Sequence, residues 1–223
     1  MITNHYGSVM KRQYVILLLM MLSFCAVAFA QKERKVSGYF HAKVWLKDGT
    51  TDDGYVNNGH HSLCVRDDVA YLTDLKGLLG PFKNRKHATK DMDSVYVWVD
   101  TDPEYVLVAH PIPVMYSYGN DTPMVYDHLC LCYVFYEGKN VTIYQAWDMM
   151  WGDFFLYKTP DMYYAKALFR CDKKLTEKRR NTLCEEFKEY TNIKNFVRTV
   201  HKNKMKDDPM AFFKLIDSVI GSK

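Results

Sequence analysis

The sequence contains no known catalytic signature. The GxSxG, HExxH, P-loop, GxGxxG and EF-hand patterns are all missing from its 223 residues, and each of them would have placed a specific nucleophile, metal ligand or phosphate loop. No CxxC pair occurs either, so the residues support neither a redox motif nor a paired-cysteine zinc site. These absences leave the activity unassigned, and no cofactor is expected.

A strong charge of one sign is also missing. The chain has 30 Lys and Arg residues against 26 Asp and Glu residues, a formal net charge of +4. The first 30 residues contain two of the basic residues, Lys11 and Arg12, and no acid, so the remainder lies within two charges of neutrality. General nucleic-acid and membrane-surface binding both depend on a basic excess. We therefore expect no nucleic-acid partner.

One long apolar run is present, near the N-terminus. The uncharged segment Tyr14–Ala30 follows two basic residues and ends in Ala28-Phe29-Ala30, an A-x-A cleavage pattern. We predict a cleaved signal peptide over residues 1–30 and an exported protein, which is periplasmic, associated with the outer envelope or secreted. The alternative is an uncleaved anchor, because the run of 17 residues is at the lower limit for spanning a bilayer. Membrane contact is expected only in that case.

Five cysteines lie beyond the predicted cleavage site, namely Cys64, Cys130, Cys132, Cys171 and Cys184. Export permits disulfides, but an odd number leaves at least one thiol over. Cys171 and Cys184 flank the start of a predicted helix, so they form a disulfide candidate. The alternative is that several of the five are buried free thiols, which are common in proteins.

Two β-rich segments around a Gly-containing turn form the central feature of the sequence. They span Met124–Trp147, and Glu137–Asn140 between them is typical of a hairpin loop. The predicted register places Tyr136 opposite Val141. Because both faces of the first segment are apolar, we expect this hairpin to lie in the middle of a sheet.

Further strand-like segments precede and follow this hairpin. Asp48-Gly49 is typical of a hairpin turn, whereas the polar segment Pro81–Ser94 is expected to form an exposed loop. Residues 31–170 are predicted to form one β-rich region.

The hydrophobic period changes from two to about 3.6 near Cys171. Thr176, Thr191 and Asp208 are candidate N-caps of successive helices, so residues 171–223 should form a helical region packed on the same domain. The predicted fold class is α+β, with a predominantly antiparallel β sheet or a partly closed barrel followed by about three C-terminal helices.

The order of the predicted elements resembles that of known proteins in two respects. The segment Val44–Val56, VWLKDGTTDDGYV, resembles the strand–DG–strand opening of small Sm-like β-barrels, and no function is carried over from it. The signal segment, this opening, the long β region and the helical tail together resemble small exported Bacteroidota proteins of unknown function. That resemblance implies a location in the cell envelope and no known activity.

One carboxylate pair is the candidate catalytic site. In the predicted register, Asp148 lies diagonal to Asp127 on one face, and diagonal neighbours approach to about 7–8 Å. Two carboxylates at such a separation can divide acid and base roles in hydrolysis. The alternative is that both acids are solvated at the ends of their strands.

Other candidates come from aromatic, cysteine and basic residues. Trp147 and Trp151 would form a stacking platform for a sugar if exposed, and would belong to the core if buried. Cys130 and Cys132 share a strand face and suggest a weaker thiol-reactive alternative. The basic run near the first C-terminal helix either contacts an anionic partner or forms a solvated face; it consists of Lys173, Lys174, Lys178, Arg179 and Arg180.

The sequence therefore favours a non-catalytic binding or assembly module of the cell envelope. Its expected partner is an envelope glycan or another envelope protein. The alternative is a hydrolase that acts on envelope glycans through Asp127 and Asp148.

Overall fold

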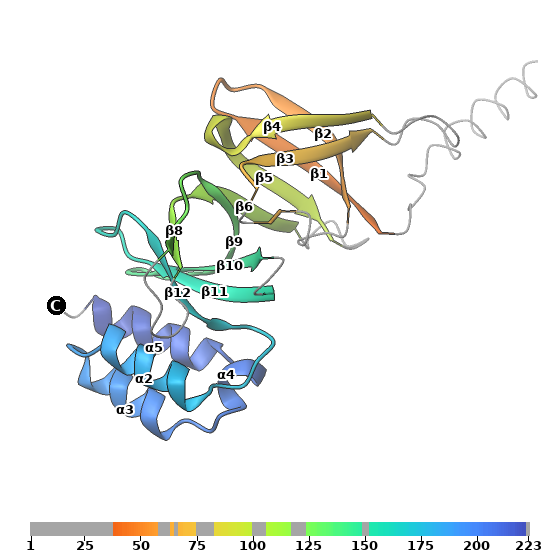
Figure 1. Cartoon of the computed structure of the whole chain (residues 1–223). Helices are drawn as coiled ribbons and strands as arrows, with labels where there is room; N and C mark the ends of the chain where they lie inside the picture. The colour runs from red at the N-terminus through yellow and green to blue at the C-terminus, as the bar shows by residue number, and fades with distance from the viewer. Residues whose placement is uncertain are drawn as a thin grey trace, which may run out of the picture. The chain divides into compact units, whose positions relative to one another are not determined.

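The computed structural model describes residues 38–57, 63–64, 67–74, 83–99, 106–116, 124–148 and 152–221 (Figure 1). The predicted signal peptide and Trp151 lie outside the described residues.

The described residues contain a single sheet of 12 strands, in the order β4-β3-β2-β1-β5-β6-β9-β10-β11-β12-β7-β8. All neighbouring strands pair antiparallel except β12 and β7. The strands are β1 (Tyr39–Leu46), β2 (Thr51–Asn57), β3 (Val69–Asp74), β4 (Lys83–Ala88), β5 (Met92–Trp98), β6 (Val106–Ile112), β7 (Val114–Tyr116), β8 (Met124–Val125), β9 (Cys130–Glu137), β10 (Thr142–Asp148), β11 (Gly152–Lys158) and β12 (Ala165–Arg170).

The predicted predominantly antiparallel α+β fold is confirmed, but the partly closed barrel is not formed. The sheet has two edges, β4 and β8, so its ends do not pair with each other. The hairpin β9–β10 lies between β6 and β11, which confirms its predicted place in the middle of the sheet. The first four residues of β9 are all buried, as expected of a strand covered on both faces.

The turn between β1 and β2 forms where the sequence predicts it. Gly49 has a φ of +85°, a conformation that glycine adopts at little steric cost. Asp48 Oδ1 accepts hydrogen bonds from the backbone N–H of Thr50 at 2.9 Å and from its hydroxyl at 2.6 Å. These bonds hold the pKa of Asp48 below its usual value.

The register predicted for the central hairpin is wrong. Tyr136 pairs with Ile143 rather than with Val141, and the register shifts again between Ile143 and Tyr144. Strand pairing ends at Glu137 opposite Thr142, so residues 138–141 form the loop.

Within the predicted loop Pro81–Ser94, the described residues 83–94 do not form the loop that their polarity indicates. These residues contain β4, the 3₁₀ turn η2 (Thr89–Asp91) and the start of β5. Strand β4 is an edge strand, where polar residues are tolerated and discourage pairing with other chains. Asp52 of β2 accepts from Arg85 Nε at 2.7 Å and lies 2.8 Å from His87 Nε2, so β4 is held by charge pairs as well as by its pairing with β3.

Four α-helices lie in the described residues, one more than predicted: α2 (Glu177–Glu186), α3 (Thr191–Thr199), α4 (Lys204–Asp207) and α5 (Met210–Ile220). The additional helix, α4, is a single turn. Thr176 is the N-cap of α2, and its side chain accepts from the N–H of Arg179 at 3.3 Å, as predicted. The N-caps of α3 and α5 are Tyr190 and Pro209, each one residue from the predicted cap.

One hydrophobic cluster contains buried residues of both the sheet and the helices. Its largest fully buried side chains include Phe187, Phe212 and Phe213 of the helical region. Phe213 packs edge-on against Phe155 of β11, with ring centroids 5.0 Å apart. Burial of aromatic surface of this kind supplies a large part of the stability of a domain. No helix within the described residues is long and apolar enough to cross a membrane.

Asp217 of α5 joins the helical region to the central hairpin. Its carboxylate accepts from the backbone N–H groups of Lys139, Asn140 and Val141 at 3.2, 2.6 and 3.1 Å. It also accepts from the hydroxyl of Tyr136 at 3.2 Å. Partial burial alone would raise the pKa of Asp217, but these donors outweigh it and the pKa is lowered. We call this arrangement the Asp217 clamp.

Candidate functional site

The two predicted catalytic carboxylates lie in different environments. The side chain of Asp127 is 99% exposed, and its Oδ1 lies 2.9 Å from Nδ1 of His128. The hydrogen bond to His128 lowers the pKa of Asp127. Asp148, at the end of β10, is fully buried and accepts from the hydroxyl of Tyr126 at 3.2 Å. The structure therefore brings Asp127 and His128 together, and it gives Asp148 no solvent-facing surface for a substrate.

A surface hollow of about 1230 Å³, including its open side, lies beside Asp127. We call it the tyrosine hollow. Its wall consists of Asp68, Ala88, Thr89, Lys90, Pro113, Val125, Tyr126, Asp127, His128, Leu129, Tyr163 and Tyr164. Asp148 is not among these described lining residues, so the predicted carboxylate pair does not face a common cavity.

The parallel pairing of β7 and β12 builds this hollow. Ala165 at the start of β12 pairs with Val114, and its N–H donates to the carbonyl of Pro113 at 2.9 Å. On the other side, the N–H of Tyr126 donates to the carbonyl of Val114 at 3.3 Å. The two residues before Ala165, Tyr163 and Tyr164, are thereby placed in the same hollow as Tyr126.

One aromatic ring of the hollow, that of Tyr163, is exposed, and the other rings are half-buried. Tyr163 is 71% exposed, and its ring meets that of Tyr164 edge-on with centroids 4.7 Å apart. Tyr126 and His128 form a second ring pair at 5.6 Å. Tyr163 and Tyr164 follow a turn in which the N–H of Met162 donates to the carbonyl of Thr159 at 3.1 Å. Sequence analysis did not identify these two tyrosines as site residues.

Trp147, one of the two predicted platform residues, is not among the described lining residues of this hollow. Trp147 is partly buried within β10, and it forms an isolated parallel bridge with Cys64. Trp151 lies outside the described residues, so its exposure stays a prediction.

The predicted disulfide is not formed in this structure. Cys171 and Cys184 are both free thiols, and both pack against the cluster shared by the sheet and the helices. Cys130 and Cys132 are fully buried. Burial raises the pKa of Cys130 to about 12 and that of Cys132 well above its ordinary value, which disfavours the thiolate that reactive cysteines require.

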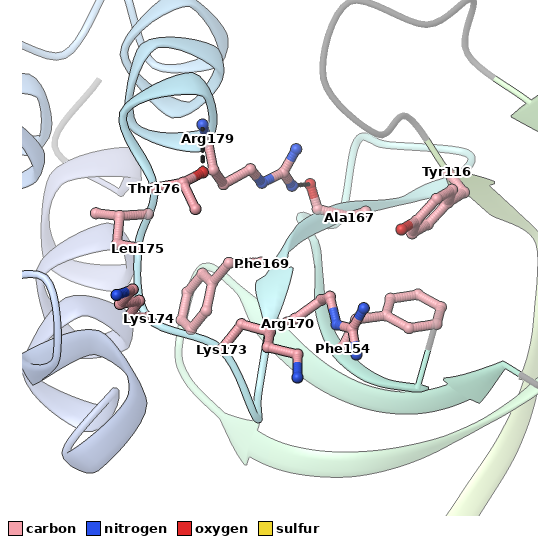
Figure 2. A pocket seen from close by; sticks show the side chains of 10 residues that line it. All are labelled: Tyr116, Phe154, Ala167, Phe169, Arg170, Lys173, Lys174, Leu175, Thr176 and Arg179. Atoms are coloured by element: carbon pink, nitrogen blue, oxygen red, sulfur yellow. Dashed lines mark hydrogen bonds between the residues drawn. The ribbon is translucent and has the colours of Figure 1, made fainter. Parts of the chain in front are cut away.

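The five residues of the predicted basic run do not form one surface: Lys178 is exposed on α2, and the other four lie in two places. Arg180 donates to the carbonyls of Val197 and Val200 at the end of α3, where a cation is stabilised by the helix dipole. Lys173, Lys174 and Arg179 line a second, smaller hollow (Figure 2).

This second hollow, the basic hollow, leaves about 40 Å³ for the centres of water-sized molecules, and the volume reaches about 440 Å³ only when open solvent is included. It is lined by Tyr116, Phe154, Ala167, Phe169, Arg170, Lys173, Lys174, Leu175, Thr176 and Arg179. Figure 2 shows Arg179 reaching from α2 to the carbonyl of Ala167, to which it donates at 2.7 Å. The same view shows the guanidinium of Arg170 beside the ring of Phe154. Arg170 and the aromatic residues of this hollow were not identified as site residues from the sequence.

No cluster of three or more His, Cys, Asp or Glu side chains suited to a metal ion occurs in the part of the chain that the structure describes. Comparison of the chain with known proteins yields no matching family model, no matching curated protein and no matching solved structure.

Proposed function

We propose that this protein is a non-catalytic binding module of the cell envelope, and that its tyrosine hollow binds a glycan. The observation that supports this most directly is that one exposed and two half-buried tyrosine rings lie with polar side chains in one concave surface. Tyr126, Tyr163 and Tyr164 supply the rings. Asp127, His128 and neighbouring polar groups surround them.

This combination matches the surface of a sugar. The C–H face of a pyranose ring is apolar and packs on an aromatic face, while its hydroxyls need donors and acceptors at the edge. Asp127 supplies carboxylate acceptors, and Lys90 supplies an ammonium donor. Ligand sites in general pair an apolar wall with a few placed polar groups.

The burial of Asp148 favours binding over hydrolysis. Glycoside hydrolysis needs two carboxyl groups on either side of the scissile bond. Asp127 reaches the hollow, whereas Asp148 is fully buried and holds Tyr126. The role assigned to Asp148 is therefore to position one wall residue of the hollow.

The test is titration of the purified protein with oligosaccharide fragments of envelope glycans, followed by calorimetry. Tyr163→Ala should weaken the binding about tenfold, which corresponds to about 1.4 kcal/mol. Tyr71→Ala is the matched control, because Tyr71 is also an exposed tyrosine, at 41%, and lies on β3 outside the hollow. Equal effects of the two changes would refute the hollow as the site.

A second aromatic surface is the alternative location for a glycan site, and the same binding test can distinguish the two. On β1 and β5, the rings of His41 and Trp98 lie 4.6 Å apart, and Trp45 packs against Tyr96 at 6.4 Å. Loss of glycan binding in Trp98→Ala together with full binding in Tyr163→Ala would move the site to these strands. Release of reducing sugar that stops in Asp127→Asn would instead establish the hydrolase alternative.

A further inference from the structure

The tyrosine hollow has more carboxylates than cations around it. Asp68 and Asp127 line it together with Lys90, which is the one Lys or Arg among its described lining residues. A third acid, Asp67, precedes Asp68 and is exposed. Three carboxylates therefore lie in or beside the hollow against one ammonium and the imidazole of His128, so the local charge is negative whether or not His128 is protonated.

These acids come from two segments that the fold brings to one place. The N–H of Asp67 donates to the carbonyl of Cys64 at 3.0 Å, and the N–H of Thr89 donates to the carbonyl of Asp68 at 2.8 Å. These bonds hold the start of β3 beside η2, whose Thr89 is buried. Asp127 lies in the segment between β8 and β9. Segments that are distant in the sequence therefore supply the negative charge.

Electrostatic interaction connects the two segments. Burial and the neighbouring carboxylate of Asp68 raise the pKa of Asp67, and the imidazole of His128 acts in the opposite direction. Asp67 is therefore within interaction range of both residues. A carboxylate whose pKa is raised by another carboxylate is repelled by it, and a bound cation relieves that repulsion.

The chain as a whole does not attract cations. Its formal net charge is +4, and exposed charges that are farther away than the screening length of about 8–10 Å have little effect. A cation at the hollow would be attracted by the local acids and not by the protein as a whole.

The rings of the hollow narrow the class of cation. Tyr163 is 71% exposed, and Tyr126 and Tyr164 are half-buried. The face of a tyrosine ring attracts an ammonium group within about 6 Å, and carboxylates accept hydrogen bonds from its N–H donors. A metal ion would need a cluster of His, Cys, Asp or Glu ligands, which the described residues do not provide. The hollow therefore suits an organic amine better than a metal ion.

We propose that the tyrosine hollow selects glycans that carry free, protonated amino groups over their N-acetylated forms. This inference rests on the proposed function, since it names the class of glycan that the same hollow binds. The pyranose ring packs on the exposed ring of Tyr163, and the ammonium group pairs with Asp68 or Asp127. N-acetylation removes the positive charge, so the acetylated sugar keeps the ring contact and loses the ionic contact.

The experiment compares two trisaccharides that differ only in acetylation, one of glucosamine and one of N-acetylglucosamine. Calorimetry at about pH 6, where amino groups of this type are protonated, should show about fivefold tighter binding of the free amine. At about pH 9 the amine is neutral, and the two affinities should agree within about twofold. A preference that persists unchanged at the higher pH, or tighter binding of the acetylated trisaccharide at the lower pH, would overturn the proposal. Any deprotonation of His128 over this range makes the hollow more negative, so it does not account for a lost preference.

Three variants separate the hollow from net charge. Asp68→Asn should reduce the preference for the free amine about threefold, whereas Lys90→Gln should increase it, because each removes one charge from the wall. Glu185→Gln is the matched control: it removes the same charge as Asp68→Asn from a side chain that is 75% exposed on α2 and outside the wall. Equal losses in Asp68→Asn and Glu185→Gln would overturn the assignment. Should Asp68→Asn fail to fold, Lys90→Gln decides the question, and an unchanged or smaller preference in that variant would overturn the proposal.

Tyr163→Ala distinguishes failure of this inference from failure of the proposed function. Equal binding of the two trisaccharides, weakened for both by Tyr163→Ala, would overturn the amine preference and leave the glycan site in place. Binding of the free amine that Tyr163→Ala does not change would place the ligand outside the hollow and overturn both. Absence of binding by either trisaccharide would overturn this inference alone, because the proposed function extends to other glycans.

Discussion

The Asp217 clamp predicts a large and pH-dependent loss of stability when its carboxylate is changed. Asp217 accepts four hydrogen bonds, from three backbone N–H groups of the hairpin loop and from Tyr136. In Asp217→Asn, the side-chain NH₂ group would face backbone donors, and only one oxygen would remain to accept. The hairpin loop and α5 are 76–81 residues apart in sequence, so the variant weakens a long-range connection.

The magnitude follows from the type of bond that is lost. A hydrogen bond to a charged group contributes about 1.5–3 kcal/mol when it is well shielded. Because Asp217 is partly exposed, solvent reduces that value, and we expect Asp217→Asn to lower the free energy of unfolding by about 2–3 kcal/mol in total. For a domain of about 190 residues, this corresponds to a fall in Tm of about 4–12 °C.

The pH dependence has a definite sign. The pKa of Asp217 is lower in the folded protein than in the unfolded chain, where it is near 3.9. The clamp therefore contributes its full stability above about pH 4, and the contribution is lost as the pH falls through the folded-state pKa. The difference in Tm between the original protein and Asp217→Asn should be largest near pH 7 and should shrink below about pH 4.

The assay is thermal unfolding followed by circular dichroism from pH 3 to pH 7. Asp208→Asn is the matched control, because the contacts of Asp208 are to neighbours in sequence, namely the ammonium of Lys204 at 2.9 Å and the backbone N–H of Met210, rather than to a distant loop. Little change is expected for that control. A loss in Asp217→Asn that is no greater than the control, or that does not vary with pH, would refute the clamp.

Three further predictions follow from single contacts. Cys130 and Cys132 should resist a maleimide reagent in the native protein and react after denaturation, since burial raises the pKa of both thiols; rapid native labelling, counted by mass spectrometry, would contradict this. Gly138→Ala should destabilise the protein by about 1–3 kcal/mol, because a Cβ at Gly138 overlaps the carboxylate of Asp217; chemical denaturation measures it, and the cost should fall when Asp217 is already Ala. Tyr126→Phe should cost about 1–2 kcal/mol by removing the hydroxyl that donates to buried Asp148; an unchanged midpoint of urea unfolding would refute that role.

Features fixed by a few neighbouring residues were predictable from the sequence. The Asp48-Gly49 turn depends on one positive φ and on bonds to Thr50, all within three residues. The N-cap of α2 likewise depends on Thr176 and the N–H of Arg179. The place of β9 in the middle of the sheet was predictable because both of its faces are apolar. Both faces of a strand are buried only when other elements cover the strand on both sides.

Features fixed by distant residues were not predictable. The register of the β9–β10 hairpin depends on a loop that Asp217 holds, and nothing within the hairpin indicates that partner. Strand β4 is polar along its length and would be a loop by composition, but Asp52 of β2 pairs with Arg85 and His87 across the sheet. The pattern of residues within one segment does not reveal its pairing with a distant segment.

The same distinction applies to the candidate site. Asp127 was identified from the sequence because its residue type suggests chemistry, and the structure places it in the tyrosine hollow beside His128. Tyr163 and Tyr164 come from a segment about 36 residues away and reach the hollow only through the parallel pairing of β12 with β7. Parallel pairing needs a long connection, and a single sequence does not show which segments it joins.

The position of Asp148 in the structure shows how a wrong register for the β9–β10 hairpin changes a functional interpretation. With Tyr136 opposite Val141, Asp148 would lie diagonal to Asp127 and resemble a catalytic partner. The register that the hairpin actually adopts is shifted by two residues at the loop end, and Asp148 is buried with the Tyr126 hydroxyl against it. A buried carboxylate that binds a hydroxyl fixes the direction of the ring that bears it. Asp148 therefore connects to the proposed glycan site by positioning Tyr126, and this connection requires no chemical step from Asp148 itself.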